Sequence, residues 1–353
     1  MPAGDLSAEM KRLFDLVSKE DASDLLISAG APPALRVNGQ ILRTKGDALT
    51  PEQSRKLIYD LLTADQRASF EKNKELDFSF AVGKKQRYRV NVYQQKQAVT
   101  AAFRPIPEEI PGLDTLGLPK QISDLAEQRQ GLVLVTGPTG HGKTTTQAAL
   151  IDLINESRAC HIITIEDPIE YVHYHKSSIV DQREVGVDTH TFLDALKYVL
   201  RQDPDVILVG EMRDLDTIQA ALRAAETGHL VLATLHTNDA IQTVDRIIDV
   251  FPGEQQQQVR FQLSMVLLAI LSQRLLPRAD GEGRVLALEL LFNTSAIANM
   301  IREGKTHQVL GIMETAAKEG MITLDKSVKS LYLEGLITFD EARAHMRNPK
   351  ELK

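Results

Sequence analysis

The sequence has one cysteine, no long hydrophobic run and no N-terminal secretion signal. Cys160 cannot form an internal disulfide or a cysteine-based zinc cluster, and its apolar neighbours predict a small core residue. The longest unbroken apolar run, residues 265–271, is far shorter than the roughly 20 residues that a membrane-spanning helix needs. The N-terminus lacks a basic region followed by an apolar stretch, so we expect a cytoplasmic protein.

An excess of positive charge is also absent. The chain has 41 lysine and arginine residues against 48 aspartate and glutamate residues, a formal net charge of −7. Nonspecific nucleic-acid binding depends on a basic surface, so no nucleic-acid partner is expected. The composition, 43% hydrophobic and 25% charged, is typical of a globular protein and excludes a wholly disordered chain. A length of 353 residues predicts two or three domains.

The first part of the chain has the pattern of a small α+β domain, residues 1–104. Apolar side chains at helical spacing over residues 6–17 predict an amphipathic helix. Thr50 and Gln53 form the pattern of a capping box at the start of a second helix. From residue 77 to 103 apolar and polar side chains alternate, which predicts strands with one buried face.

A proline-rich segment then predicts a linker, residues 105–118. Residues 119–293 alternate between helical segments and apolar runs at 132–136, 162–165, 206–209 and 229–235. Such runs are typical of a parallel sheet that helices cover on both faces, so this domain is predicted to be α/β. Residues 294–353 are predicted to be helical, with a further capping box at Thr338 and Glu341.

The strongest motif is a phosphate-binding loop (P-loop) directly after the first of these strands. The predicted nucleotide-binding residues are Gly137, Pro138, Thr139, Gly140, His141, Gly142, Lys143, Thr144 and Thr145. The glycines let backbone amides converge on phosphates at a helix N-terminus, expected near Thr145, while Lys143 reaches the β- and γ-phosphates and Thr144 can ligate Mg²⁺. ATP and Mg²⁺ are therefore the predicted cofactors. At the position of His141 the backbone amide matters more than the side chain, so we expect a tolerated substituent.

Acidic side chains follow two of the predicted strands. Glu166 and Glu170 come after residues 162–165, and Glu211 comes after residues 206–209. Ligands of open α/β sheets gather at the carboxyl ends of the strands, where these carboxylates are expected. They are predicted to orient the attacking water and, in the case of Glu211, to hold the metal directly or through water.

Two histidines bracket the last of these strands. His229 and His236 are seven residues apart, a distance of roughly 23 Å along a strand, so they cannot share one metal ion. Each is either a locally hydrogen-bonded core histidine or a functional group. His236, at the carboxyl end, is the better candidate to sense the γ-phosphate.

These motifs together resemble those of bacterial secretion ATPases. Residues 166–170, 202–214 and 227–238 resemble the Asp box, the Walker B motif and the His box of that superfamily. Within it the chain is most similar to the type IV pilus retraction ATPases, the PilT family, over most of its length. The resemblance implies a RecA-like P-loop ATPase domain, a smaller PAS-like N-terminal domain and a homohexamer. The implied activity is ATP-driven pilus retraction at the cytoplasmic face of the inner membrane, acting on a platform protein, with a paralogous retraction ATPase as a further partner.

The resemblance also assigns roles to individual residues. It makes Glu211 the Walker B glutamate, places Glu166 and Glu170 in the Asp box, and pairs His229 with His236 in the His box. It further implies that the N-terminal domain supplies arginines to a neighbour's nucleotide, and the candidates are Arg87, Arg89 and Arg104. The alternative for these three is a solvated strand face.

Three positions depart from the family pattern. Ala298 stands where retraction ATPases typically have the first arginine of a C-terminal motif, residues 23–26 include a leucine in place of a histidine, and His141 replaces a small residue. The altered C-terminal motif keeps an auxiliary retraction subunit as an alternative. A pilus-assembly or type II secretion ATPase usually has a longer N-terminal region and four zinc-binding cysteines, which this chain lacks. A RecA-like nucleic-acid translocase is the alternative of another class, and the charge balance gives it no support.

Overall fold

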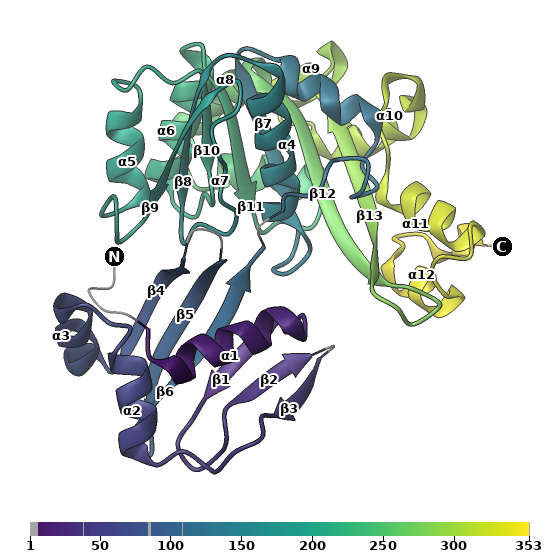
Figure 1. Cartoon of the computed structure of the whole chain (residues 1–353). Helices are drawn as coiled ribbons and strands as arrows, with labels where there is room; N and C mark the ends of the chain where they lie inside the picture. The colour runs from purple at the N-terminus through teal and green to yellow at the C-terminus, as the bar shows by residue number, and fades with distance from the viewer. Residues whose placement is uncertain (1–5, 38, 84–85, 108, 353) are drawn as a thin grey trace. The chain divides into compact units, whose positions relative to one another are not determined.

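The computed structural model describes residues 6–37, 39–83, 86–107 and 109–352 (Figure 1). The chain divides into two compact units, Met1–Glu109 and Ile110–Lys353. This division falls inside the segment 105–118 that the prolines mark as a linker, although the last strand of the first unit continues to Ile106. Within the described ranges, no helix combines the length and the apolar character needed to cross a bilayer.

In its described residues the first unit is an antiparallel sheet with three helices, which confirms the predicted α+β character. The sheet has the strand order β3-β2-β1-β6-β5-β4. In chain order the elements are α1 (Ala8–Lys19), β1 (Asp24–Ile27), β2 (Ala34–Val37), β3 (Gln40–Arg43), α2 (Pro51–Tyr59), α3 (Ala64–Asn73), β4 (Glu75–Val82), β5 (Gln86–Gln95) and β6 (Ala98–Ile106).

The helices of this unit pack against one face of its sheet. Phe14 of α1 lies with its ring centroid 4.4 Å from that of Tyr88 in β5, and both side chains are buried. At the start of α2, Thr50 and Gln53 make both hydrogen bonds of the predicted capping box. The alternation along β5 is also confirmed, because Tyr88, Val90 and Val92 are buried while the residues between them are not.

The second unit is built on a mixed sheet of strand order β13-β12-β7-β11-β10-β8-β9. All neighbouring pairs are parallel except β12 and β13. Its elements are η1 (Lys120–Glu127), β7 (Gly131–Thr136), α4 (Lys143–Ser157), β8 (His161–Glu166), β9 (Ile179–Glu184), α5 (Phe192–Val199), β10 (Val206–Val209), α6 (Leu215–Glu226), β11 (Leu230–Leu235), α7 (Ala240–Asp249), α8 (Gly253–Val266), β12 (Leu267–Pro277), β13 (Arg284–Phe292), α9 (Ser295–Arg302), η2 (Thr306–Gln308), α10 (Val309–Thr315), η3 (Ala317–Glu319), α11 (Leu324–Leu333), α12 (Phe339–His345) and η4 (Pro349–Leu352).

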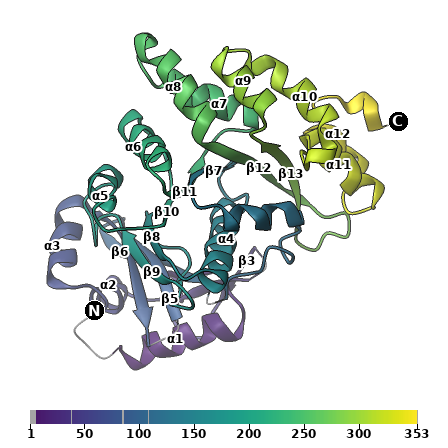
Figure 2. The same ribbon diagram turned by 90° about the horizontal axis from the view of Figure 1, so that it is seen from above.

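Helices cover both faces of this sheet, as the apolar runs predict (Figure 2). Leu132 and Leu134 of β7 point into a core shared with α5 to α9, while Val133 points into a second core with α4 and η1. Side chains alternate between the two faces of a strand, so a strand made only of apolar residues contributes side chains to the cores on both faces of the sheet. Cys160 is only half-buried at the edge of the second core, so the expectation of a core residue is wrong in part.

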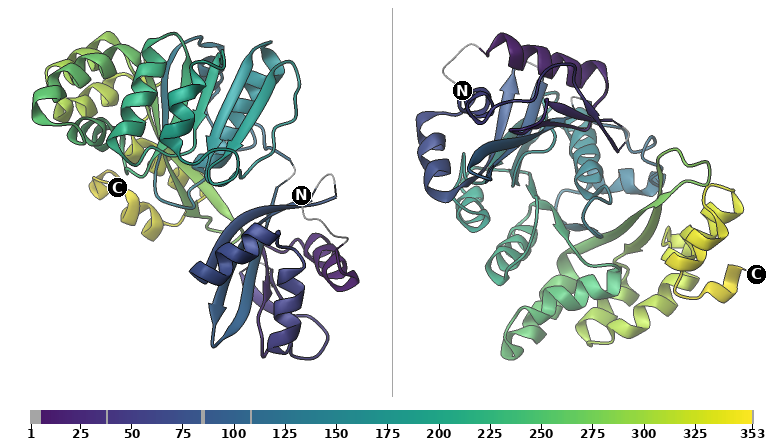
Figure 3. Two further views of the ribbon diagram at one scale, coloured as in Figure 1. Left: turned by 90° about the vertical axis from the view of Figure 1, so that its left-hand side faces the viewer. Right: turned by 90° about the horizontal axis from the view of Figure 1, so that it is seen from below.

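A long hairpin, β12 and β13, was not predicted from the sequence. The apolar run at residues 265–271 contains the end of α8 and the beginning of β12. The C-terminal helices α11 and α12 lie beside this hairpin (Figure 3), and α11 contacts β13. At α12, Thr338 caps the helix, but the Glu341 carboxylate lies 3.1 Å from His345 Nε2, so the second predicted capping box is only half present.

Candidate active site

The P-loop connects β7, which ends at Thr136, to α4, which begins at Lys143, two residues before the expected start. Gly137 is required by close packing, since a Cβ atom there would lie 2.4 Å from the carbonyl oxygen of Gln273 in β12. Gly142 precedes α4 with φ of +81°, a conformation that favours glycine. The unpaired backbone amides of the loop and of the α4 N-terminus therefore converge, as an anion-binding site requires.

Lys143 places its cation at the centre of this loop. Its Nζ donates hydrogen bonds to the carbonyl oxygens of Gly137 at 2.8 Å and Pro138 at 3.0 Å, and lies 3.4 Å from Nδ1 of His236. The side chain is buried, and this burial lowers the pKa of Lys143 against the opposing effect of the Glu211 and Glu170 carboxylates. A buried cation with its charge only partly balanced is suited to bind phosphate.

A chain of polar contacts runs from Lys143 to the end of β10. His236 follows β11, and its Nε2 lies 2.8 Å from Oε1 of Glu211. Arg213 is bound to the same carboxylate, with Nε 2.6 Å from Oε1 and Nη2 2.7 Å from Oε2. Burial alone would raise the pKa of Glu211, but the Arg213 hydrogen bond and the charges of His236 and Arg213 hold it below its usual value. Glu211 is therefore ionised at neutral pH.

Glu166 is the most perturbed carboxyl group of the site. It ends β8 with 7% of its surface exposed, and its Oε1 accepts hydrogen bonds from Oγ1 of Thr164 at 2.6 Å and Nε2 of Gln182 at 3.1 Å. Burial raises the pKa of Glu166 to about 7 despite these hydrogen bonds. A carboxyl group that is half-ionised near neutral pH can both accept and return a proton. Sequence patterns gave no signal for the contribution of Gln182.

The remaining predicted nucleotide residues lie at the rim of this site. Thr145 places Oγ1 3.1 Å from the hydroxyl oxygen of Tyr171, which tethers the first turn of α4 to the segment after β8. Glu170 is exposed in the same segment, and Thr139 is exposed on the P-loop. Thr144 is half-buried in the first turn of α4.

The donor set suits Mg²⁺ only together with phosphate oxygens. Among the residues that the structure describes, no three acidic, histidine or cysteine side chains cluster closely enough to hold a metal. Magnesium in nucleotide sites keeps several waters and takes one or two protein ligands. Thr144 can supply one such ligand, whereas Glu211 is already bound to Arg213 and His236 and would act through water.

The structure separates the two histidines that the resemblance pairs. His229 lies before β11, at the amino end of the strand, and its Nδ1 is 2.9 Å from the carbonyl oxygen of Ala224 and 3.3 Å from Oγ1 of Thr227. A strand of six residues holds it away from His236, which lies beside Lys143. His229 is thus a locally hydrogen-bonded residue and not part of the Lys143 site.

The three candidate arginines have their described contacts inside the first unit. Arg104 donates from Nε and Nη2 to Oδ1 of Asp24 at 2.9 and 2.8 Å. Arg87 donates to Oγ of Ser79 at 2.8 Å. Arg89 is exposed and stands directly opposite Arg104 in the register of β5 and β6. This face of the sheet therefore places Arg89 beside Arg104, and Arg104 is paired with Asp24.

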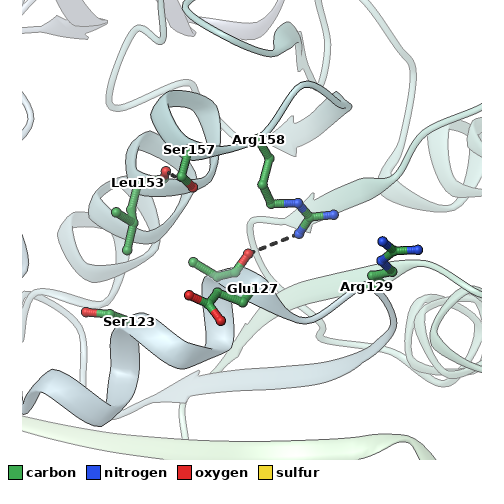
Figure 4. Close-up of a pocket in the computed structure, with 7 residues that line it drawn as sticks. Ser123, Glu127, Arg129, Leu153, Ser157 and Arg158 are labelled. Atoms are coloured by element: carbon green, nitrogen blue, oxygen red, sulfur yellow. Dashed lines mark hydrogen bonds between the residues drawn. The ribbon is translucent and has the colours of Figure 1, made fainter.

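A separate depression of about 370 Å³ lies at the other end of α4 (Figure 4). It is lined by Ser123, Ala126, Glu127, Arg129, Leu153, Ser157 and Arg158. Arg158 uses Nη1 to bind the carbonyl oxygens of Ala126 at 3.0 Å and Gln128 at 2.8 Å. The C-terminus of a helix presents carbonyl groups and a negative dipole end, which disfavours phosphate. The P-loop is thus the better candidate for the nucleotide site.

Comparison with known proteins agrees with these features. Residues 109–316 match the family model for type II/IV secretion system proteins. The chain is 46% identical to the type IV pilus retraction ATPase PilT of Pseudomonas aeruginosa over 97% of its own length and 99% of the relative. This chain belongs to the PilT family of secretion ATPases. The predicted α/β fold and ATPase class are thereby confirmed.

Other members of the PilT family are similar over the same span. The type IV pilus ATPase PilU of P. aeruginosa is 42% identical over 98% of this chain and 90% of its own. The crystal structure of the pilus retraction motor PilT with bound ADP superimposes with a TM-score of 0.91 at 52% identity, covering 97% of this chain and 98% of that chain. Both units therefore have counterparts in the family.

Proposed function

We propose that this PilT-family ATPase is a motor that retracts type IV pili, powered by ATP at the carboxyl edge of the sheet in the second unit. The proposal depends on similarity to retraction ATPases along nearly the whole chain. It is supported by the contacts that join Lys143, His236 and Glu211 beside the P-loop. Nucleotide is the ligand that this arrangement fits best.

In this proposal the P-loop amides and Lys143 hold the β- and γ-phosphates. Mg²⁺, bound by Thr144 and through water by Glu211, would supply a positive charge that offsets charge on the phosphates. Glu166 orients the attacking water and accepts its proton, a role for which a pKa of about 7 is suited. Glu170, which is exposed in the segment after β8, assists in orienting that water.

His236 is proposed to report the state of the γ-phosphate. Its ring lies 3.4 Å from Nζ of Lys143 on one side and 2.8 Å from Glu211 on the other. A change in the position of the Lys143 cation would therefore alter the hydrogen bond to the Walker B carboxylate. His229 has no such link and is assigned a local structural role.

The working assembly is proposed to be a homohexamer at the cytoplasmic face of the inner membrane. In it Arg87, Arg89 or Arg104 would reach the nucleotide of a neighbouring copy, because a guanidinium can neutralise charge that develops on the γ-phosphate. Domain rotation about a hinge at residues 104–112 would carry force to a pilus platform protein. A paralogous retraction ATPase is the further proposed partner, and no nucleic-acid partner is proposed.

The decisive experiment is to delete the gene in its native cell and to complement it with wild type or Lys143→Ala. Surface pili are then counted by electron microscopy. We expect excess pili and lost twitching motility, rescued by wild type only. Bald cells would identify an extension motor and overturn the proposal.

An auxiliary retraction subunit is the second candidate. It is favoured by Ala298, which lies half-buried in α9 where the retraction motif has an arginine. The two roles differ in their dependence on a second ATPase. If the chain restores motility to a strain that lacks every other retraction ATPase, it is a complete motor, and if it restores motility only beside a second one, it is auxiliary.

A further inference from the structure

Beyond the end of β7, the P-loop runs along an edge of β12 that no strand of the described ranges covers. β7 pairs with β12 as far as Thr136 opposite Ser272, and there β7 ends. β12 continues to Pro277, so its last residues project beyond the end of β7. Backbone N–H groups on an uncovered strand edge require other hydrogen-bond acceptors.

His141 supplies one of these acceptors. Its Nδ1 accepts a hydrogen bond from the backbone N–H of Leu275 at 2.9 Å, a contact between residues 134 positions apart in the sequence. One residue earlier in the loop, the carbonyl oxygen of Gly140 accepts a hydrogen bond from Nη1 of Arg284 in β13 at 3.0 Å. Both strands of the hairpin therefore bind the tip of the P-loop.

The hairpin that makes these contacts is itself held in place by core packing. Leu276, the neighbour of Leu275, is buried together with Ala287 of β13 in the core formed with α11 and α12. Earlier along β12, Nε2 of Gln273 donates to Oγ1 of Thr146 at 2.8 Å inside α4. The start of the loop and the first turns of α4 are thus fixed independently of His141, whereas the loop tip depends on it and on Arg284.

We propose that His141 is a positioning residue, whose imidazole fastens the tip of the P-loop to β12 and so holds the loop amides in the arrangement that binds nucleotide phosphates. This inference rests on the proposed phosphate site at Lys143. It replaces the expectation that His141 is only a tolerated substituent. A small residue at this position would leave the N–H of Leu275 without this acceptor.

The surroundings of His141 keep its ring neutral, as an acceptor must be. Burial lowers the pKa of His141, and the nearby charges of Arg284, Lys143, Arg274 and His345 lower it further. Because Leu275 donates to Nδ1, the ring proton is placed on Nε2. Protonation at acid pH would turn Nδ1 into a donor and remove the hydrogen bond.

The test uses the purified full-length chain with His141→Ala, His141→Asn and His141→Gln, and His307→Ala as an exposed-histidine control. The dissociation constant of a fluorescent ADP analogue with Mg²⁺ is measured by titration, together with kcat and KM for ATP. Oδ1 of asparagine can occupy the place of Nδ1, whereas the amide of glutamine extends to the place of Nε2. We therefore expect His141→Ala and His141→Gln to weaken ADP binding about fivefold, which corresponds to about 1 kcal/mol.

His141→Asn is expected to bind ADP within about twofold of wild type, a rescue that a loss of general stability would not show. The weaker nucleotide binding should raise KM and leave kcat unchanged, because the loop contacts stabilise the ground state and the transition state equally. As pH falls below the usual histidine pKa of about 6.5, wild-type affinity should fall more than that of His141→Asn, since the titration of ADP and of other groups in the site affects both proteins alike.

Wild-type ADP affinity in His141→Ala, or equal affinities in the Asn and Gln variants, would overturn the inference. The Asn and Gln comparison remains decisive if His141→Ala does not fold. The Lys143→Ala variant, measured in the same assay, distinguishes a failure of the proposed phosphate site from a failure of the positioning role of His141. If Lys143→Ala also binds ADP normally, the phosphate site itself is wrong, and if only the His141 variants bind normally, the positioning role alone is wrong.

Discussion

The two ends of the parallel strands in the second unit carry similar residue types in different surroundings. At the carboxyl ends, Lys143, His236 and Glu211 contact one another beside a glycine-rich loop. At the amino ends, His229 and Arg158 bind backbone carbonyl oxygens. A histidine or a basic residue therefore becomes a candidate for catalysis only where other side chains and unpaired backbone amides converge on it.

The pKa shifts at the two ends have different causes. At the carboxyl ends burial raises the pKa of Glu166 to about 7 and lowers that of Lys143, whereas Arg213 and His236 hold the pKa of Glu211 below its usual value. At the amino ends burial would lower the pKa of His161, but hydrogen bonds to Asp181 and to the Asp203 carbonyl oxygen raise it. Burial thus destabilises the charges of Glu166 and Lys143, which a bound ligand can compensate, whereas partners within the protein stabilise the charge of His161.

The largest predicted effect is at the centre of the P-loop. Lys143→Ala should lower ATPase activity about 100-fold to 1,000-fold, because it removes a preorganised cation from the phosphates. Arg158→Ala, the matched loss of a cation at the amino end, should leave activity within about twofold of wild type. Steady-state phosphate release by both variants tests this contrast. Equal losses of ATPase activity would mean that the carboxyl and amino ends of the sheet do not differ in function.

Glu166→Gln should lower kcat about 100-fold, because an amide cannot accept the proton of the attacking water. The same variant should change how stability depends on pH. The folded-state pKa of about 7 lies above the unfolded value of 4.5, so the folded protein binds the proton more tightly and stability falls as pH rises between these values.

The stability lost over this interval is roughly 3 kcal/mol as an upper bound. Thermal unfolding from pH 4.5 to 8, with EDTA and without nucleotide, should show this decline in wild type and a flatter profile in Glu166→Gln. Parallel profiles for the two proteins would mean that Glu166 is not buried as the structure shows.

A smaller difference in activity is predicted between substitutions of the two histidines that flank β11. His236→Ala should lower kcat about tenfold, since it breaks the link between Lys143 and Glu211, and His229→Ala should leave kcat within about twofold. Single-turnover ATP hydrolysis by each variant checks this difference. If His229→Ala proves equally damaging, His229 acts through a contact that its present hydrogen bonds do not reveal.

The smallest effect is expected at the amino end, from the ion pair between His161 and Asp181. The pKa of His161 is raised, so the pair stabilises the folded state below the usual histidine pKa and this contribution is lost as pH rises through the folded value. Both side chains are partly exposed, at 25% and 59%, so screening limits the gain to about 0.5 kcal/mol. Urea unfolding of Asp181→Asn at pH 5.5 and pH 8 should show a deficit only at the lower pH.

Much of the site could be predicted because its signals are local. The P-loop residues are consecutive, Glu166 ends one of two parallel strands, and Glu211 lies two residues after the other. The hairpin of β12 and β13 was missed because residues 265–271 read equally well as helix or strand. The contact of the His141 side chain could not be predicted for a related reason, since its partner Leu275 lies 134 residues away.

Sequence alone determined the strands β7, β8, β10 and β11, the phosphate-binding loop and the carboxylates that follow its neighbouring strands, since periodicity and spacing are properties of short segments. Only the tertiary structure decided which side chains meet. It joined His236 to Lys143 and Glu211, left His229 at the opposite end of β11, and brought Gln182 to Glu166. Strand register and burial set these contacts and the pKa values that follow from them, and both depend on the packed sheet as a whole.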